Sequence, residues 1–300
     1  MVEVILSSPR GFCAGVVRAI EVVELCLERY GPPVYVKHQI VHNPYVVDQL
    51  EKKGAITVER IEDIPPGSLV VFSAHGSPPE DFEQAREREL KVIDAVCPLV
   101  TRVHNEAKKY HREGKKVLLV GHRGHQEVRG TMGQVPMTLI DDHAGSQLPD
   151  WESDSEVVVL TQTTLSVGDT AEAIDSIQRT YPNSIVRNDI CYATTNRQEA
   201  VTKMAAKVDL VLVIGAPNSS NCNQLREVAE ALGVPAHLIN GPKEIDPAWL
   251  VGRTKVGVTS GASTPEVLVE SVIQALSPEK VTHLTGVEED VSFTLPKELR

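Results

Sequence analysis

The sequence lacks the features that mark membrane, disulfide-rich or nucleic-acid-binding proteins. No apolar run approaches the roughly 18 residues that a membrane span needs, and no basic region followed by an apolar one marks a secretory signal. The five cysteines are odd in number and widely spaced, which argues against a disulfide framework. The net charge of −11 argues against non-specific binding to nucleic acid, which needs basic patches. We therefore expect a cytoplasmic protein whose thiols stay reduced.

The chain reads as alternating strands and helices. Its 300 residues are too many for one ordinary core, and we expect two or three domains. Short runs of Val, Ile and Leu alternate with amphipathic stretches, as strands covered on both faces and their connecting helices do. We predict an α/β fold with small, mostly parallel sheets and strands at Val4–Leu6, Val34–Val36, Leu69–Phe72, Val117–Val120, Val157–Leu160, Leu210–Ile214 and Lys255–Val258.

Polar residues follow five of these strands directly. Ligands bind at the carboxyl ends of strands in open parallel sheets. One polar strand end is ordinary turn chemistry, but five in one chain favour a shared polar pocket. The five segments are Ala74–Gly76, Gly121–Glu127, Thr161–Thr164, Asn218–Asn221 and Ser260–Ser263.

Three cysteines occupy similar places in a loose internal repeat. Cys13, Cys97 and Cys191 each stand at or just before the expected start of a helix. For the last of these helices, the run Thr195–Gln198 fits a capping box. The helix dipole and the N–H groups at such a position favour a thiolate. Three such thiolates that converge would make a soft-metal site.

The repeat predicts a division of the chain into three α/β domains and a tail. The tail is expected to pack on the body of the protein. The predicted boundaries are 14–96 for the first domain, 97–192 for the second, 193–281 with the N-terminal strand 1–13 for the third, and 282–300 for the tail.

The spacing of the cysteines distinguishes between classes of metal site. Zinc sites usually take close pairs such as C-x₂-C, and neither these nor compact ferredoxin-type runs occur. Three separate thiolates suit an iron–sulfur cluster with one iron that the protein does not hold, and an open iron is a Lewis acid. The alternatives are a glycine loop around Cys13 that cradles a phosphate, and cysteines that are small core residues. We expect a core role for Cys26, whereas Cys222 stays unassigned.

Histidines and one glutamate stand near the glycine-rich strand ends. His42, His75 and His125, with nearby Ser, Thr and Asn, are suitable donors to phosphate oxygens. The run "HRGHQE" lacks the spacing that places two zinc-binding histidines on one helix face. Glu127 is the carboxylate within that loop, and a raised pKa would make it a general acid. The alternative is an ordinary surface glutamate.

Nine blocks of the sequence resemble the LytB/IspH family of 4-hydroxy-3-methylbut-2-enyl diphosphate reductases. The resemblance covers nearly the whole chain and implies a trefoil of three α/β domains around a central 4Fe–4S cluster. It implies one cluster per chain, held by Cys13, Cys97 and Cys191, with one iron open to the substrate. The blocks are "RGFCAGVVRAI", "VHNPYVV", "FSAHGSPPE", "DAVCPLVTRVH", "GHQEVRGTMGQ", "TQTTLSV", "NDICYATTNRQEA", "NSSNCNQLREVA" and "VTSGASTPEVLV".

The same resemblance implies a reaction and a set of site residues. The reaction is a two-electron reductive dehydroxylation that yields isopentenyl and dimethylallyl diphosphate, the last step of the non-mevalonate isoprenoid pathway. A ferredoxin or flavodoxin supplies the electrons. Glu127, with Thr163 and His125, forms the catalytic group, and Thr163 lies near the substrate hydroxyl. The remaining substrate-binding residues are His42, His75, Ser219, Ser220, Asn221 and Ser263, together with His125 again.

Two other functions share part of this pattern. A quinolinate synthase-like dehydratase would have three lone cysteines and an open iron, but it would need no external electron donor. A non-catalytic iron–sulfur or phosphate sensor would bind a cluster without any role for Glu127. A requirement for a reductant, and the effect of replacing Glu127, would separate these functions from a reductase.

Overall fold

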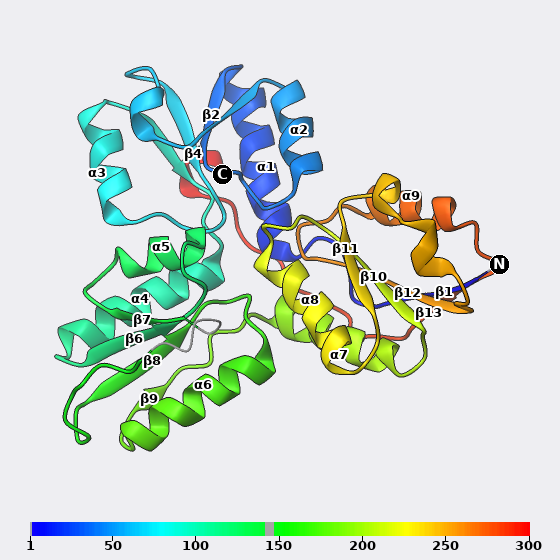
Figure 1. Ribbon diagram of the computed structural model, residues 1–300. Coiled ribbons are helices and arrows are strands. Elements are labelled where there is room, and N and C mark those ends of the chain that lie inside the picture. The colour runs from blue at the N-terminus through cyan, green and yellow to red at the C-terminus, as the bar shows by residue number, and fades with distance from the viewer. Residues whose placement is uncertain (1, 142–146) are drawn as a thin grey trace. The chain divides into compact units, whose positions relative to one another are not determined.

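The computed structural model describes residues 2–141 and 147–300, which contain three separate parallel sheets (Figure 1). These residues form two compact units. Unit 1 comprises Met1–Val16, His42–Val46 and Tyr192–Ser292, and unit 2 comprises Val17–Val41, Val47–Cys191 and Phe293–Arg300. All strand pairs in the three sheets are parallel. The predicted α/β class is confirmed, whereas the predicted domain boundaries stay predictions.

Unit 1 is built on one five-stranded sheet with the order β11-β10-β12-β1-β13. The strands are β1 (Glu3–Leu6), β10 (Leu210–Ile214), β11 (Ala236–Ile239), β12 (Lys255–Ser260) and β13 (Lys280–His283). The helices are α7 (Tyr192–Ala205), α8 (Ser220–Ala231) and α9 (Glu266–Leu276), with the short helices η2 (Pro242–Glu244) and η3 (Pro247–Leu250).

The sheet of unit 1 is buried on both faces. Val4 and Leu6 of β1 pack in one apolar cluster, whereas Ile5 between them packs in another. Because successive side chains of a strand point to opposite faces, a strand covered on both sides needs an unbroken apolar run. The two-sided core therefore explains why β1, β10 and β12 were visible in the sequence.

Unit 2 contains two four-stranded sheets, with the orders β3-β2-β4-β5 and β7-β6-β8-β9. The first consists of β2 (Val34–Lys37), β3 (Ala55–Val58), β4 (Leu69–Phe72) and β5 (Lys91–Asp94). The second consists of β6 (Lys116–Val120), β7 (Thr138–Ile140), β8 (Val157–Thr161) and β9 (Ile185–Val186). Helices α1 and α2 begin on unit 1 residues. The helices are α1 (Ala14–Tyr30), α2 (Pro44–Lys52), α3 (Pro79–Glu87), α4 (Pro98–Arg112), α5 (Gln126–Met132) and α6 (Val167–Thr180), with η1 (Ile61–Asp63) and η4 (Lys297–Leu299).

One helix start differs from the sequence-based expectation. Helix α7 begins at Tyr192, so Thr195 and Gln198 lie inside it and do not form a capping box at its start. Cys191 directly precedes this helix, and its N–H donates to the carbonyl oxygen of Thr163 at 3.0 Å. Strand β13 extends across residue 282, where the tail was expected to begin, and it pairs with β1.

In the described part of the chain, no helix is long and apolar enough to cross a membrane.

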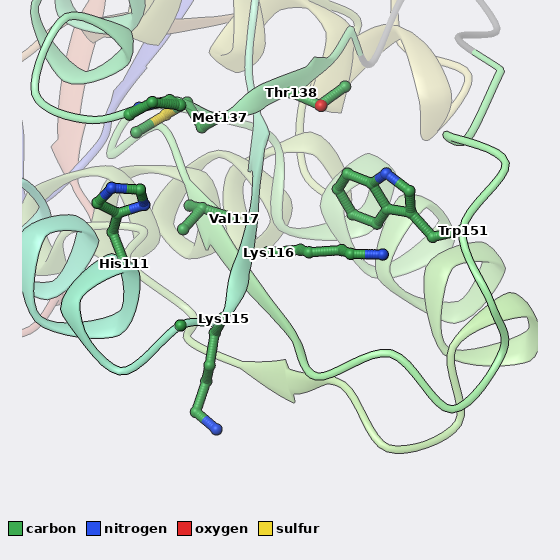
Figure 2. Close-up of a pocket in the computed structure, with 9 residues that line it drawn as sticks. His111, Lys115, Lys116, Val117, Met137, Thr138 and Trp151 are labelled. Carbon is green, nitrogen blue, oxygen red and sulfur yellow. The ribbon is translucent and has the colours of Figure 1, made fainter.

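A pocket of about 400 Å³ opens at the end of α4 and the start of β6, where Lys116 lies 4.9 Å from the centre of the Trp151 ring (Figure 2). None of the predicted site residues lines this pocket.

Candidate active site

The predicted site residues are divided evenly between the two units. We call those in unit 1 the unit 1 set and those in unit 2 the unit 2 set. The unit 1 set is Cys13, His42, Ser219, Ser220, Asn221 and Ser263, and the unit 2 set is His75, Cys97, His125, Glu127, Thr163 and Cys191.

Within the unit 2 set, two hydrogen bonds join Glu127 to Thr163. The backbone N–H of Thr163 donates to Oε1 of Glu127 at 2.6 Å, and its Oγ1 donates to Oε2 at 2.8 Å. Strands β6 and β8 are neighbours in one parallel sheet, so the loops after their carboxyl ends meet. His125 caps helix α5, and its Nδ1 accepts from the backbone N–H of Glu127 at 3.2 Å. Glu127 is therefore a buried carboxyl with both oxygens bound, not a surface glutamate.

Burial raises the pKa of Glu127 to about 7. Desolvation of the carboxylate is the main cause, and the negative charge of Asp189 adds to it. The two hydrogen bonds from Thr163 and the charge of His122 act in the opposite direction, because they stabilise the ionised form. A carboxyl that titrates near neutral pH can hold a proton and release it, as a general acid requires.

The two histidines of the unit 2 set face one another. The rings of His75 and His125 lie edge to face, with their centres 6.0 Å apart. Gly76, which follows His75, has a φ of +81°, and a Cβ there would lie 2.8 Å from Cε1 of His104. A Cβ on Gly130 of α5 would lie 2.7 Å from the carbonyl oxygen of Gly76. The His75 loop thus packs between α4 and α5 at positions where a side chain does not fit.

Each cysteine of the unit 2 set precedes a helix and is tied to a strand-end loop. Cys97 is the N-cap of α4, and its N–H donates to the carbonyl oxygen of Ala74 at 3.0 Å. Cys191 precedes α7, and its N–H donates to the carbonyl oxygen of Thr163, also at 3.0 Å. The predicted cysteine ligands are thereby coupled through the backbone to the segments that carry His75 and Thr163.

The unit 1 set is held together by loops after β1, β10 and β12. The N–H of Cys13 donates to the carbonyl oxygen of Ala262 at 3.1 Å, and that cysteine precedes α1. Ser263 Oγ donates to the carbonyl oxygen of His42 at 3.1 Å, and Asn218 Nδ2 lies 3.3 Å from Nδ1 of His42. Within unit 1, the structure therefore brings a predicted metal ligand to the same loop as predicted phosphate donors.

The start of helix α8 contains a buried amide, that of Asn221, for which the described residues supply no hydrogen-bond partner. Ser219 is the N-cap, and Ser220 and Asn221 form the first turn. Asn221 is 4% exposed, and neither atom of its amide makes a hydrogen bond among the described residues. An unsatisfied buried amide is costly, which favours a ligand that supplies its partners. Helix N-termini attract anions, so the chemistry of this turn suits a phosphate.

Sequence reasoning missed Gln224, one turn further along α8. Gln224 is 1% exposed, and within the described ranges its amide oxygen and nitrogen also have no hydrogen-bond partner. The spacing of Asn221 and Gln224 could have indicated Gln224, because residues three apart share a helix face and Asn221 was already a candidate. Nothing in the composition of the turn distinguished Gln224 from a solvated glutamine.

The remaining two cysteines are core residues. Cys26 and Cys222 are fully buried, and burial raises the pKa of each thiol to about 11. Cys222 fills the space between Gly215 and Gly261, where an added Cβ would collide with its Sγ. These two thiols therefore stay protonated, unlike thiols that bind metal.

The donor set fits an iron–sulfur cluster in its chemistry. All five cysteines lie in the described residues and none forms a disulfide, and Cys13, Cys97 and Cys191 are partly exposed at helix starts. Soft thiolate ligands select iron–sulfur clusters. Across residues 2–141 and 147–300, no group of three or more His, Cys, Asp or Glu side chains is arranged to hold a metal ion. The assignment of the three cysteines therefore stays a prediction.

The fold and the site residues define an α/β protein that carries thiols, histidines, hydroxyl groups and a buried carboxyl at the carboxyl ends of parallel strands. The family model described as "LytB protein" matches residues 4–277. The chain therefore belongs to the LytB protein family, and the resemblance seen in the sequence is confirmed.

Relatives with full-length similarity carry the name of one enzyme. A protein of Rhodopseudomonas palustris named 4-hydroxy-3-methylbut-2-enyl diphosphate reductase 1 is 52% identical over 98% of both chains. A protein of Glaesserella parasuis named 4-hydroxy-3-methylbut-2-enyl diphosphate reductase is 49% identical, over 99% of this chain and 98% of its own.

Solved structures agree with these relatives. The E-1-hydroxy-2-methyl-but-2-enyl-4-diphosphate reductase of Plasmodium falciparum superposes with a TM-score of 0.93 at 37% identity, covering 99% of this chain and 96% of that one. A second structure is titled (E)-4-hydroxy-3-methyl-but-2-enyl diphosphate reductase, the terminal enzyme of the non-mevalonate pathway. It has a TM-score of 0.64 at 35% identity, with 92% of this chain and 99% of that one covered.

Proposed function

We propose that this protein reduces 4-hydroxy-3-methylbut-2-enyl diphosphate to isopentenyl and dimethylallyl diphosphate. The observation that carries the proposal is its full-length similarity to relatives of that name. The overall reaction breaks the C–O bond of the allylic alcohol and forms a C–H bond. It consumes two electrons and two protons and releases water. The chain must therefore bind a diphosphate, admit electrons and supply protons.

The diphosphate is bound by hydrogen-bond donors of the predicted set. We assign this role to the imidazoles and hydroxyl groups of the predicted set and to the unsatisfied amide of Asn221. Because the net charge is −11, the overall field does not attract an anion, and local donors must hold it. The residues are His42, His75, His125, Ser219, Ser220, Asn221 and Ser263.

Three thiolates would hold the iron–sulfur cluster through which the electrons would enter. We assign Cys13, Cys97 and Cys191 as ligands of one 4Fe–4S cluster per chain, which leaves one iron without a protein ligand. When bound, such a cluster supplies one-electron transfer and a Lewis-acid site. The donor we propose is a ferredoxin or flavodoxin, and we propose a cytoplasmic location, where thiols stay reduced.

Glu127 supplies a proton to the departing oxygen. Its raised pKa keeps a substantial fraction of the carboxyl protonated near neutral pH. Thr163 Oγ1, at 2.8 Å from Oε2, orients the carboxyl and can pass a proton between it and the substrate hydroxyl. His125 caps the helix on which Glu127 lies, and it therefore serves both positioning and binding.

Anaerobic reconstitution followed by Mössbauer spectroscopy, with and without the substrate, tests this function. We expect a distinct fourth iron whose signal changes on substrate addition, and turnover only when a reductant is present. Turnover without a reductant would favour the dehydratase alternative. A cluster with no consumption of the allylic diphosphate would favour a sensor. Cys13→Ser should lose or destabilise the cluster, and an intact cluster in that variant would remove Cys13 from the ligands.

A further inference from the structure

Arg197 is a fully buried cation that the proposed reaction does not use. It lies on α7 in unit 1 and has 0% exposure. A buried guanidinium is costly unless its charge is paired and its N–H groups find acceptors. What Arg197 contacts therefore indicates which parts of unit 1 it holds together.

The guanidinium connects the Cys13 loop to the C-terminal segment. Its Nη2 donates to the carbonyl oxygen of Gly11 at 2.8 Å, two residues before Cys13. Nη1 and Nη2 donate to the two carboxylate oxygens of Glu289, at 3.0 and 3.2 Å. Nη1 also donates to the carbonyl oxygen of Ala193 on its own helix, at 2.8 Å. Asn196 Nδ2 donates to the same Glu289 carboxylate at 3.0 Å.

A second contact attaches the C-terminal segment to the same loop. A Cβ on Gly286 would collide with the carbonyl oxygen of Ser8, so the two backbones are in direct contact there. At one end, the segment Gly286–Glu289 thus contacts the Ser8–Cys13 loop. At its other end, Glu289 binds Arg197, which in turn binds the Gly11 carbonyl of that loop. All of these residues belong to unit 1.

We propose that Arg197 and Glu289 are positioning residues for Cys13. Arg197 fixes the Gly11 carbonyl, and Glu289 fixes Arg197 in the orientation that does so. The C-terminal segment thereby sets how firmly the Cys13 loop is ordered, and how long a cluster bound through Cys13 is retained. The part about the cluster rests on the proposed function, whereas the ordering of the loop does not.

Hydrogen exchange on the metal-free full chain tests the ordering of the loop. In Glu289→Gln we expect the amides of residues 10–14 to exchange about tenfold faster, since a hydrogen bond to a charged group is worth roughly 1.5 kcal/mol or more and 1.4 kcal/mol corresponds to a factor of about ten. Segment 116–120 of unit 2 should be unchanged. In reconstituted protein, loss of iron to a chelator should accelerate by a similar factor.

Two further variants separate positioning from general stability. Glu199→Gln removes a carboxylate from the same helix, where Glu199 forms an exposed pair with Lys203, and it should leave exchange and iron loss unchanged. The double variant Arg197→Met, Glu289→Met removes the buried guanidinium together with its partly buried carboxylate partner and should recover thermal stability. It should not recover the protection of residues 10–14, because the Gly11 carbonyl stays unbound.

The outcomes distinguish the two proposals. Wild-type exchange at residues 10–14 in both the Glu289 and the double variants would overturn the positioning role. So would an equal effect of Glu199→Gln. If the wild-type chain binds no cluster but the variants still loosen the loop, the proposed function fails and the positioning of Cys13 stands.

Discussion

The protonation of Glu127 illustrates how residues in this protein acquire their chemistry from their surroundings. The carboxyl is 4% exposed, and Thr163 donates to both of its oxygens. Burial favours the neutral form and the hydrogen bonds favour the charged form, and burial is the larger effect. The result is a group that titrates close to the pH at which an acid catalyst is useful.

Replacing Glu127 by Gln should separate catalysis from stability. Turnover should fall by about 10²–10⁴, the usual contribution of a general acid, while the iron content is unchanged.

Folding raises the pKa of Glu127 from its ordinary 4.5 to about 7, so its contribution to the free energy of unfolding is complete below about pH 4.5 and is lost as the pH rises through about 7. The neutral Gln avoids this loss. Urea unfolding of the Glu127→Gln variant should show higher stability than wild type at pH 8 and similar stability at pH 4.5. Unchanged turnover in this variant would remove Glu127 from the proton path.

Replacing Thr163 by Val should move the titration of Glu127 upward. The hydroxyl of Thr163 donates to the carboxylate and lowers its pKa, so removing that donor favours the protonated form. The alkaline limb of the pH–rate profile should shift to higher pH. Thr163→Ser, which keeps the hydroxyl, is the matched control and should leave the limb in place. A shift to lower pH in the valine variant would contradict the assignment of that limb to Glu127.

At the scale of elements, the sequence revealed the central strands and missed the edges. All seven predicted strands are present, as β1, β2, β4, β6, β8, β10 and β12. The strands that it missed are β3, β5, β7, β9, β11 and β13, and each lies at an edge of its sheet. Central strands are buried on both faces and need continuous apolar residues, whereas edge strands have partners on one side and tolerate polar ones. Lys91–Asp94, with its exposed first lysine, is an example.

The variant Gly130→Ala tests how closely helix α5 packs against the His75 loop. Gly130→Ala should destabilise the protein by about 1–3 kcal/mol, because the new Cβ would lie 2.7 Å from the backbone carbonyl of Gly76, which can give way only if its loop is displaced. It should also raise the KM, since His75 lies on the displaced loop. Gly168→Ala on α6 is the matched control: the new Cβ would find its nearest neighbour, Ser166 Oγ, at 3.7 Å. Urea unfolding of both variants measures the difference, and equal stabilities would show that the contact at Gly130 is not tight.

At the scale of the whole molecule, the C-terminal residues serve both units. The segment to Ser292 belongs to unit 1, and Phe293–Arg300 belongs to unit 2. Within unit 2, Arg18 donates from Nε to the carbonyl oxygen of Thr294 at 2.8 Å and from Nη1 to that of Val96 at 3.0 Å, next to Cys97. The chain end therefore contributes to the surroundings of two predicted cysteine ligands, one in each unit.

The variant Leu299→Ala measures how much the C-terminal end of the chain contributes to the free energy of unfolding. It is 1% exposed, so Leu299→Ala should cost about 2–5 kcal/mol in the free energy of unfolding. Val251→Ala is the control, because Val251 is 80% exposed and should change stability by about 0.5 kcal/mol or less. Thermal and urea unfolding of the two variants provide the comparison. A cost for Leu299→Ala no larger than the control would show that the end of the chain is not part of the core.

The sequence by itself determined the α/β class, the central strands, the family and the list of candidate residues, because apolar runs and motif blocks are local patterns. It placed Cys13, Cys97 and Cys191 at helix starts for the same reason. The tertiary structure decided what those residues touch. Only the packing of β6 against β8 binds Glu127 to Thr163 and raises its pKa, and only the folded unit 1 brings Arg197 to Gly11 and Glu289. Burial and contacts between distant segments depend on the whole fold, so they are not encoded in any short stretch of sequence.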